Sequence, residues 1–138
     1  MLKPMNATLI GYIVCLAVLL GLDAVWLTTT NSTIYQPAIG ELLAAKPNIA
    51  AIALFYPLSV LGVVYFALNP ALNSGAWTDA LIKGALFGLF AYATYDLTNM
   101  ATLKVWSLKL TLLDMAWGTF LTGVSATLGF FITRLFVR

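Results

Sequence analysis

Four stretches of the sequence are long enough and apolar enough to cross a lipid bilayer. They cover Ala7–Thr29, Ile49–Leu68, Asp79–Met100 and Leu110–Val137. Crossing about 30 Å of hydrocarbon takes roughly 20 mostly apolar residues, and a helix satisfies its backbone hydrogen bonds internally. The sequence therefore predicts an all-α fold, a four-helix transmembrane bundle that forms one integral membrane domain over residues 1–138.

The composition agrees with a membrane protein and excludes several functions. Apolar residues make up 62% of the chain and charged residues 9%, whereas a soluble domain has about 25% charged residues. The chain has no histidine and a single cysteine, Cys15, so we expect no haem, zinc or iron–sulfur site. A net charge of +2 is too small to indicate nucleic acid binding.

The connections between the spans differ in character. Pro37 begins a segment in which apolar residues recur at helical spacing and which ends at Lys46-Pro47. We therefore expect a short interfacial helix between the first two spans. Residues 69–75 are rich in Asn, Pro, Ser and Gly, which predicts a tight turn between the second and third spans.

The distribution of basic residues gives an orientation. The side that holds both termini carries Lys3, Lys83, Arg134 and Arg138, and the other side carries Lys46, Lys104 and Lys109. Because basic residues are enriched on the cytoplasmic side of membrane proteins, this small excess favours cytoplasmic termini.

Three of the predicted spans contain an aspartate. Counted at 1.5 Å per residue, Asp23, Asp96 and Asp114 all fall roughly 24 Å from the membrane face that holds the termini. A carboxylate inside a membrane helix costs about 2.5–3.5 kcal/mol on insertion scales, so these groups are expected to face the bundle interior. Structural hydrogen bonding is the alternative role, although such bonds average only about 0.6 kcal/mol.

Aromatic and amide residues accompany these acids. The third residue after each aspartate is a tryptophan or an asparagine, and at this spacing both side chains lie on one helix face. In the second span a tyrosine precedes Pro57, where a kink can open the bundle. The tryptophans are alternatively interfacial anchors. We expect one ligand-binding pocket formed by Asp23, Trp26, Tyr56, Tyr95, Asp96, Asn99, Asp114 and Trp117.

The third span has one face of small and polar residues. Gly84-x-x-x-Gly88 is a pair that lets a neighbouring helix approach closely. Tyr95 and Asn99 share an arc of about 80° with these glycines, and Asp96 falls at its margin.

Three segments carry a resemblance to a known family. They are LDAVWL at residues 22–27, YATYDLTNMAT at residues 92–102 and DMAWG at residues 114–118. In these segments the chain resembles a bacterial family of small inner-membrane proteins called domain of unknown function 2177. The resemblance implies a four-helix protein of the bacterial inner membrane and brings no established activity.

Three functions are compatible with these residues. Carboxylates beside indoles suit Mg²⁺, Ca²⁺, Mn²⁺ or an organic ammonium group, which favours a module that binds or transports a cation. For transport, a chain this short would need to form a homo-oligomer. The alternatives are a membrane enzyme that uses aspartate acid/base chemistry on a lipid or isoprenoid, and an accessory subunit of a membrane complex. The partners we expect are the lipid bilayer, a second copy of the chain and a small cationic ligand.

Overall fold

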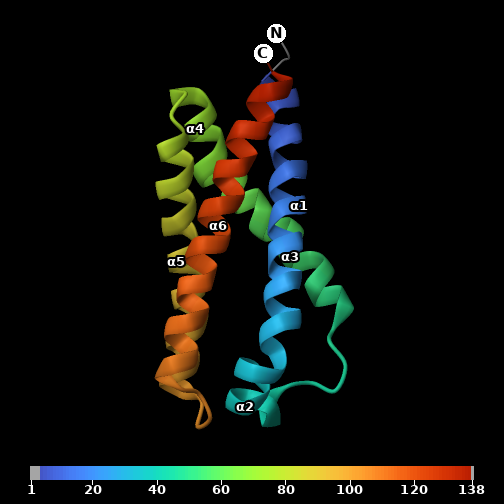
Figure 1. Ribbon diagram of the computed structural model, residues 1–138, viewed down its shortest axis with the longest axis vertical. Helices are drawn as coiled ribbons and strands as arrows, with labels where there is room; N and C mark the ends of the chain where they lie inside the picture. The colour runs from blue at the N-terminus through green and yellow to red at the C-terminus, as the bar shows by residue number, and fades with distance from the viewer. Residues whose placement is uncertain (1–3, 138) are drawn as a thin grey trace.

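The computed structural model describes residues 4–137, which form helices and no strand. The helices are α1 (Pro4–Thr30), α2 (Gln36–Ile39), α3 (Ile49–Val63), α4 (Asn69–Ser74), α5 (Trp77–Thr102) and α6 (Leu108–Phe136). Both ends of the described chain lie at one end of the bundle, beside α4 (Figure 1). We call this the terminal end, and we call the opposite end, which holds α2 and the α5–α6 connection, the distal end.

Three helical segments of the described chain are both long and apolar enough to cross a membrane. They are Met5–Leu42, Ile49–Ser74 and Leu108–Phe136. At 26 residues α5 is also long enough, but it is more polar and carries the ionisable side chains Asp79, Lys83 and Asp96. The all-α membrane bundle is confirmed, and the membrane crossing of α5 stays a prediction. Helix α5 packs chiefly against α6.

Small residues bring α5 and α6 together. A Cβ placed on Gly84 would lie 2.8 Å from the Cβ of Ala126 and 2.9 Å from the carbonyl oxygen of Thr122. A Cβ on Gly88 would overlap the carbonyl oxygen of Gly118. Because these neighbours are backbone atoms and side-chain atoms close to the backbone, which cannot move away easily, only glycine permits this helix separation, and the close approach predicted for the Gly84/Gly88 face is present.

A dense apolar core fills the terminal half of the bundle. Cys15, Leu68 and Phe130 are buried there. They lie where α1 and α6 meet the π-helical turn that follows α3, Val64–Leu68. A Cβ on Gly129 would lie 2.5 Å from the sulfur of Cys15, and one on Gly11 would overlap the Leu68 side chain. This half of the molecule is therefore held by direct contact between helices.

The prediction of a tight turn over residues 69–75 is wrong. The helix that begins with α3 continues through a π-helical turn, Val64–Leu68, and then through α4 to Ser74. Pro70 follows the π-helical turn directly, and this local change in the hydrogen-bonding pattern accommodates a residue without a backbone N–H. Only Gly75 breaks the helix, because its φ of 74° is left-handed and its N–H caps the carbonyl of Ala71.

The short helix after the first span is present with different bounds. Helix α1 passes through a π-helical turn, Asn31–Tyr35, directly into α2, and a 3₁₀ turn, Gly40–Leu42, follows. The helical path thus ends before Lys46-Pro47, which the sequence marks as its end. Tyr35 ends the π-helical turn, and its hydroxyl donates to Asp114 on α6.

Candidate ligand-binding site

Asp23 on α1 joins three helices at the distal half of the bundle. It is 7% exposed, and one of its oxygens accepts a hydrogen bond of 3.0 Å from the indole N–H of Trp117 on α6. The other oxygen accepts a hydrogen bond from the hydroxyl of Tyr56 on α3. Both carboxylate oxygens of Asp23 therefore have donors, and this acid is an anchor for its neighbours.

A pair of stacked indoles continues this arrangement. The rings of Trp26 and Trp117 lie 4.5 Å apart between centroids, with planes inclined by 6°. The N–H of Trp26 donates to the hydroxyl of Tyr35 at 2.9 Å, and that hydroxyl donates to Asp114 at 2.6 Å. These contacts form one aromatic–carboxylate network, which consists of Asp23, Trp26, Tyr35, Tyr56, Asp114 and Trp117.

The indoles are paired across helices. Spacing along the sequence places Trp26 beside Asp23 and Trp117 beside Asp114. In the structure the indole N–H of Trp117 reaches Asp23, and the indole N–H of Trp26 reaches Asp114 only through a tyrosine hydroxyl. The network therefore links α1 and α6 twice, once from Trp117 to Asp23 and once from Trp26 through Tyr35 to Asp114.

Asp96 has a different environment from the other two acids. It is 0% exposed and lies within the buried stripe of α5 that includes Gly84 and Gly88, not at its margin. Among residues 4–137, no hydrogen-bond partner reaches either of its carboxyl oxygens, and the carboxyl group of Asp114 lies nearby on α6. A buried polar group without a partner costs free energy, and this distinguishes Asp96 from Asp23, whose two oxygens both accept hydrogen bonds.

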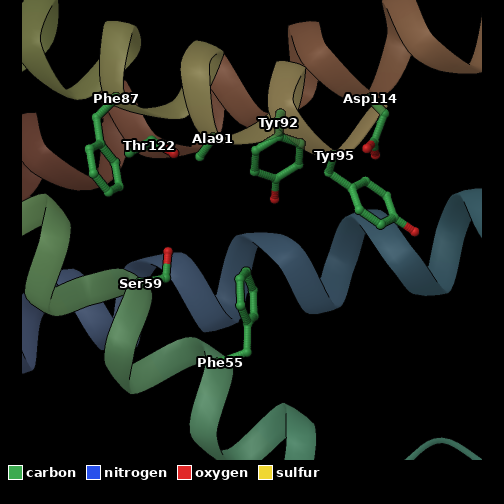
Figure 2. Close-up of a pocket in the computed structure, with 8 residues that line it drawn as sticks. All are labelled: Phe55, Ser59, Phe87, Ala91, Tyr92, Tyr95, Asp114 and Thr122. Atoms are coloured by element: carbon green, nitrogen blue, oxygen red, sulfur yellow. The ribbon is translucent and has the colours of Figure 1, made fainter. Parts of the chain in front are cut away.

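A cavity of about 380 Å³ lies between α3 on one side and α5 with α6 on the other (Figure 2). The hydroxyl groups of Tyr92 and Ser59 point into it. Asp114 lies at one end, and it is the charged group among the described residues that line the cavity. The full lining consists of Phe55, Ser59, Phe87, Ala91, Tyr92, Tyr95, Asp114 and Thr122.

The position of Tyr92 depends on a glycine of the facing helix. A Cβ on Gly118 would overlap the ring of Tyr92, so the ring can lie against α6 only where that helix has no side chain. From this position the Tyr92 hydroxyl extends into the cavity (Figure 2). Gly118 does not line the cavity, but it determines where the Tyr92 ring lies in the cavity wall.

The charges of the site are not balanced by basic side chains. Among residues 4–137 the one ion pair is Asp79–Lys83, with 3.4 Å between the ammonium nitrogen and a carboxylate oxygen, near the terminal end of α5. Over the same residues, no group of three His, Cys, Asp or Glu side chains is arranged to hold a metal ion. Asp114 thus presents a carboxylate to an aromatic cavity without a basic partner.

The eight residues singled out in the sequence occupy four kinds of position. Five belong to the aromatic–carboxylate network, and Asp96 is buried close to Asp114 without lining the cavity. Tyr95 is 57% exposed at the edge of the cavity, whereas Asn99 lies one turn further along α5 and does not line it. Their role in binding stays a prediction. The sequence interpretation missed Tyr35 in the network and Phe55 and Phe87 in the cavity wall.

These features define an integral membrane protein of helical bundle type, with a carboxylate network buried in its distal half. The chain belongs to the family described as Predicted membrane protein (DUF2177), whose model matches residues 8–131 and so includes all three aspartates. Neither a curated protein nor a solved structure matches the chain.

Proposed function

We propose that this protein binds a small organic cation in the cavity beside Asp114. The observation that carries the proposal is a cavity of about 380 Å³ with aromatic walls and one carboxylate, which no basic side chain of the described residues neutralises. An ammonium group over an aromatic ring gains about 0.5–2 kcal/mol, and a carboxylate adds charge attraction in the same place. A volume in this range is typical of small-molecule sites.

The surroundings of Asp114 favour an organic cation over a metal ion. Mg²⁺, Ca²⁺ and Mn²⁺ take several oxygen ligands, and carboxylates usually supply more than one of them. Asp23 is held by two donors of its own, and Asp96 does not line the cavity. One carboxylate surrounded by rings is suited to a cation that carries its own apolar groups.

The location of the site sets its membrane side. With the inner membrane and cytoplasmic termini that the sequence favours, the distal end faces away from the cytoplasm. The ligand would then be bound in the outer half of the bilayer. Transport across the membrane would need a path that continues past the dense terminal half, which is the reason to expect a homo-oligomer for that activity.

The test is calorimetric titration of the purified protein with choline chloride, together with an uncharged analogue in which carbon replaces the nitrogen. The wild-type protein is expected to bind choline and to discriminate against the uncharged analogue by about tenfold or more, which corresponds to about 1.4 kcal/mol. Asp114→Asn keeps an acceptor for Tyr35 and removes the charge, so choline binding should weaken to the same extent.

Asp79→Asn is the matched control, because it removes an acid of the surface pair at the other end of α5. It should bind choline as the wild type does. Equal binding of choline by the wild type and Asp114→Asn, or equal binding of the charged and uncharged ligands, would contradict the proposal.

A further inference from the structure

The cavity has a polar end and an apolar end, and we infer from this that its ligand is an amphiphilic amine with a single apolar chain. The ammonium group is bound at Asp114, and the chain runs along the cavity toward the terminal end. This inference rests on the proposed function and adds the class of ligand to it.

The lining residues change in polarity along the cavity. Asp114 and Tyr95 lie at one end of it, and Phe87 and Thr122 lie at the other (Figure 2). The hydroxyl of Thr122 donates to the carbonyl of its own helix at 2.8 Å, so that it presents mainly its methyl group to a ligand. The end remote from the carboxylate is therefore suited to hydrocarbon.

The cavity is also elongated. Thr122 follows Asp114 by eight residues on α6, and Phe87 precedes Tyr95 by eight residues on α5. Eight residues of helix rise about 12 Å, so the two ends of the cavity are separated by about that length. A compact ammonium ion fills only the part beside Asp114, and the remaining length accommodates an alkyl chain.

The cavity wall faces the hydrocarbon of the membrane at its edge. Phe55 is 52% exposed on α3, a helix whose neighbouring leucines Leu54 and Leu58 are also exposed. An amphiphile can therefore enter sideways from the bilayer, with its charged group toward the distal surface and its chain toward the bilayer centre. This is the orientation that it already has in that leaflet, so entry needs no inversion.

The charge of the cavity lining favours amines without a phosphate group over phospholipids with an amine headgroup. A phospholipid with an amine headgroup also carries a phosphate, which basic side chains bind. No described residue of the cavity lining is basic. The site is thus suited to an amine without phosphate, and the hydroxyls of Tyr92 and Ser59, which point into the cavity, are the polar groups along the chain.

The experiment measures binding of an alkyltrimethylammonium series to the protein in lipid nanodiscs by tryptophan fluorescence, starting from tetramethylammonium. Wild-type affinity should rise with chain length and level off when the chain fills the cavity. Ala91→Leu places a larger side chain on the apolar part of the wall. It should weaken binding of the octyl compound by about tenfold, as expected for the loss of roughly two buried methylene groups, and leave tetramethylammonium within about twofold.

Two comparisons make the result decisive. Ala101→Leu makes the same change at an exposed position of α5 that does not line the cavity, so it controls for effects of the larger side chain outside the cavity. Lysophosphatidylethanolamine should bind less tightly than an alkylamine of equal chain length. Tetramethylammonium binding without any chain-length effect, or with an equal effect of Ala91→Leu on short and long compounds, would overturn this inference and leave the proposed function standing. Failure of every ammonium compound to bind would overturn both.

Discussion

The terminal half and the distal half of this bundle hold the same helices together by different means. Toward the termini, glycines and small apolar residues bring helices into direct contact, as at Gly84 on α5 and Gly129 on α6. Toward α2, long aromatic side chains such as Trp117 and Tyr35 span the space between helices and donate to carboxylates. The cavity lies in this second region (Figure 2).

The difference shows how a short membrane protein makes room for a ligand. Lipid is as apolar as a protein core, so helices associate in a membrane mainly through close packing and hydrogen bonds between them. Close packing leaves no space, whereas hydrogen bonds between long side chains fix the helices at a larger separation. Glycines hold α5 and α6 together along the bundle, and the cavity lies where α3 stands apart from this pair.

The largest effect is expected for a methyl group in the packed half. Gly84→Ala should lower the free energy of unfolding by about 1–3 kcal/mol, because the new Cβ meets the backbone of α6 and the helices must separate. Gly21→Ala is the matched control on α1, where a Cβ would have no neighbour within 4 Å. It should be neutral or stabilising by up to about 1 kcal/mol.

Unfolding of both variants is followed by helical circular dichroism during titration with sodium dodecyl sulfate. Equal changes for the two glycine variants would show that the stability of the terminal half does not depend on contact between helices.

A smaller loss is expected for the anchor of the distal half. Asp23→Ala leaves the Tyr56 hydroxyl and the Trp117 indole without their acceptor, which should cost about 1–2 kcal/mol on the scale of hydrogen bonds between membrane helices. Tyr56→Phe removes one donor. If the two residues act together, the double variant will lose less stability than the sum of the single variants.

The same titration measures the cycle, and the near-ultraviolet circular dichroism of the stacked indoles reports on the geometry. Strict additivity would show that the Tyr56 hydrogen bond to Asp23 contributes nothing. The distal half would then owe its stability to packing, as the terminal half does.

The sequence predicts the helices well because long apolar segments depend little on their surroundings. The first and last predicted spans differ from α1 and α6 by only a few residues at each end. Residues 69–75 are the exception, because Asn, Pro and Ser are typical of turns, and a π-helical turn before Asn69 lets the helix continue.

The site was less predictable than the fold for a geometric reason. Spacing along one helix gives the direction of a side chain on that helix, but its partner depends on the rotation and offset of the next helix. The indole of Trp117 on α6 therefore donates to Asp23 of α1, whereas the indole of Trp26 reaches Asp114 only through the hydroxyl of Tyr35. Tyr35 was missed because it lies nine residues beyond Trp26, in a segment that reads as the end of a span, and only the π-helical turn brings it back.

The smallest effect on stability is expected at Asp96, although it is the most deeply buried of the three acids. Asp96→Asn removes no hydrogen bond within the described residues and introduces an amide that can donate to Asp114. The free energy of unfolding should change by less than about 0.5 kcal/mol or rise slightly, since replacing an unpartnered polar group costs nothing in lost contacts. The sodium dodecyl sulfate titration used for Asp23→Ala checks this directly. A loss as large as that for Asp23→Ala would mean that Asp96 also anchors the helices. Asp23 and Asp96 would then have the same structural role.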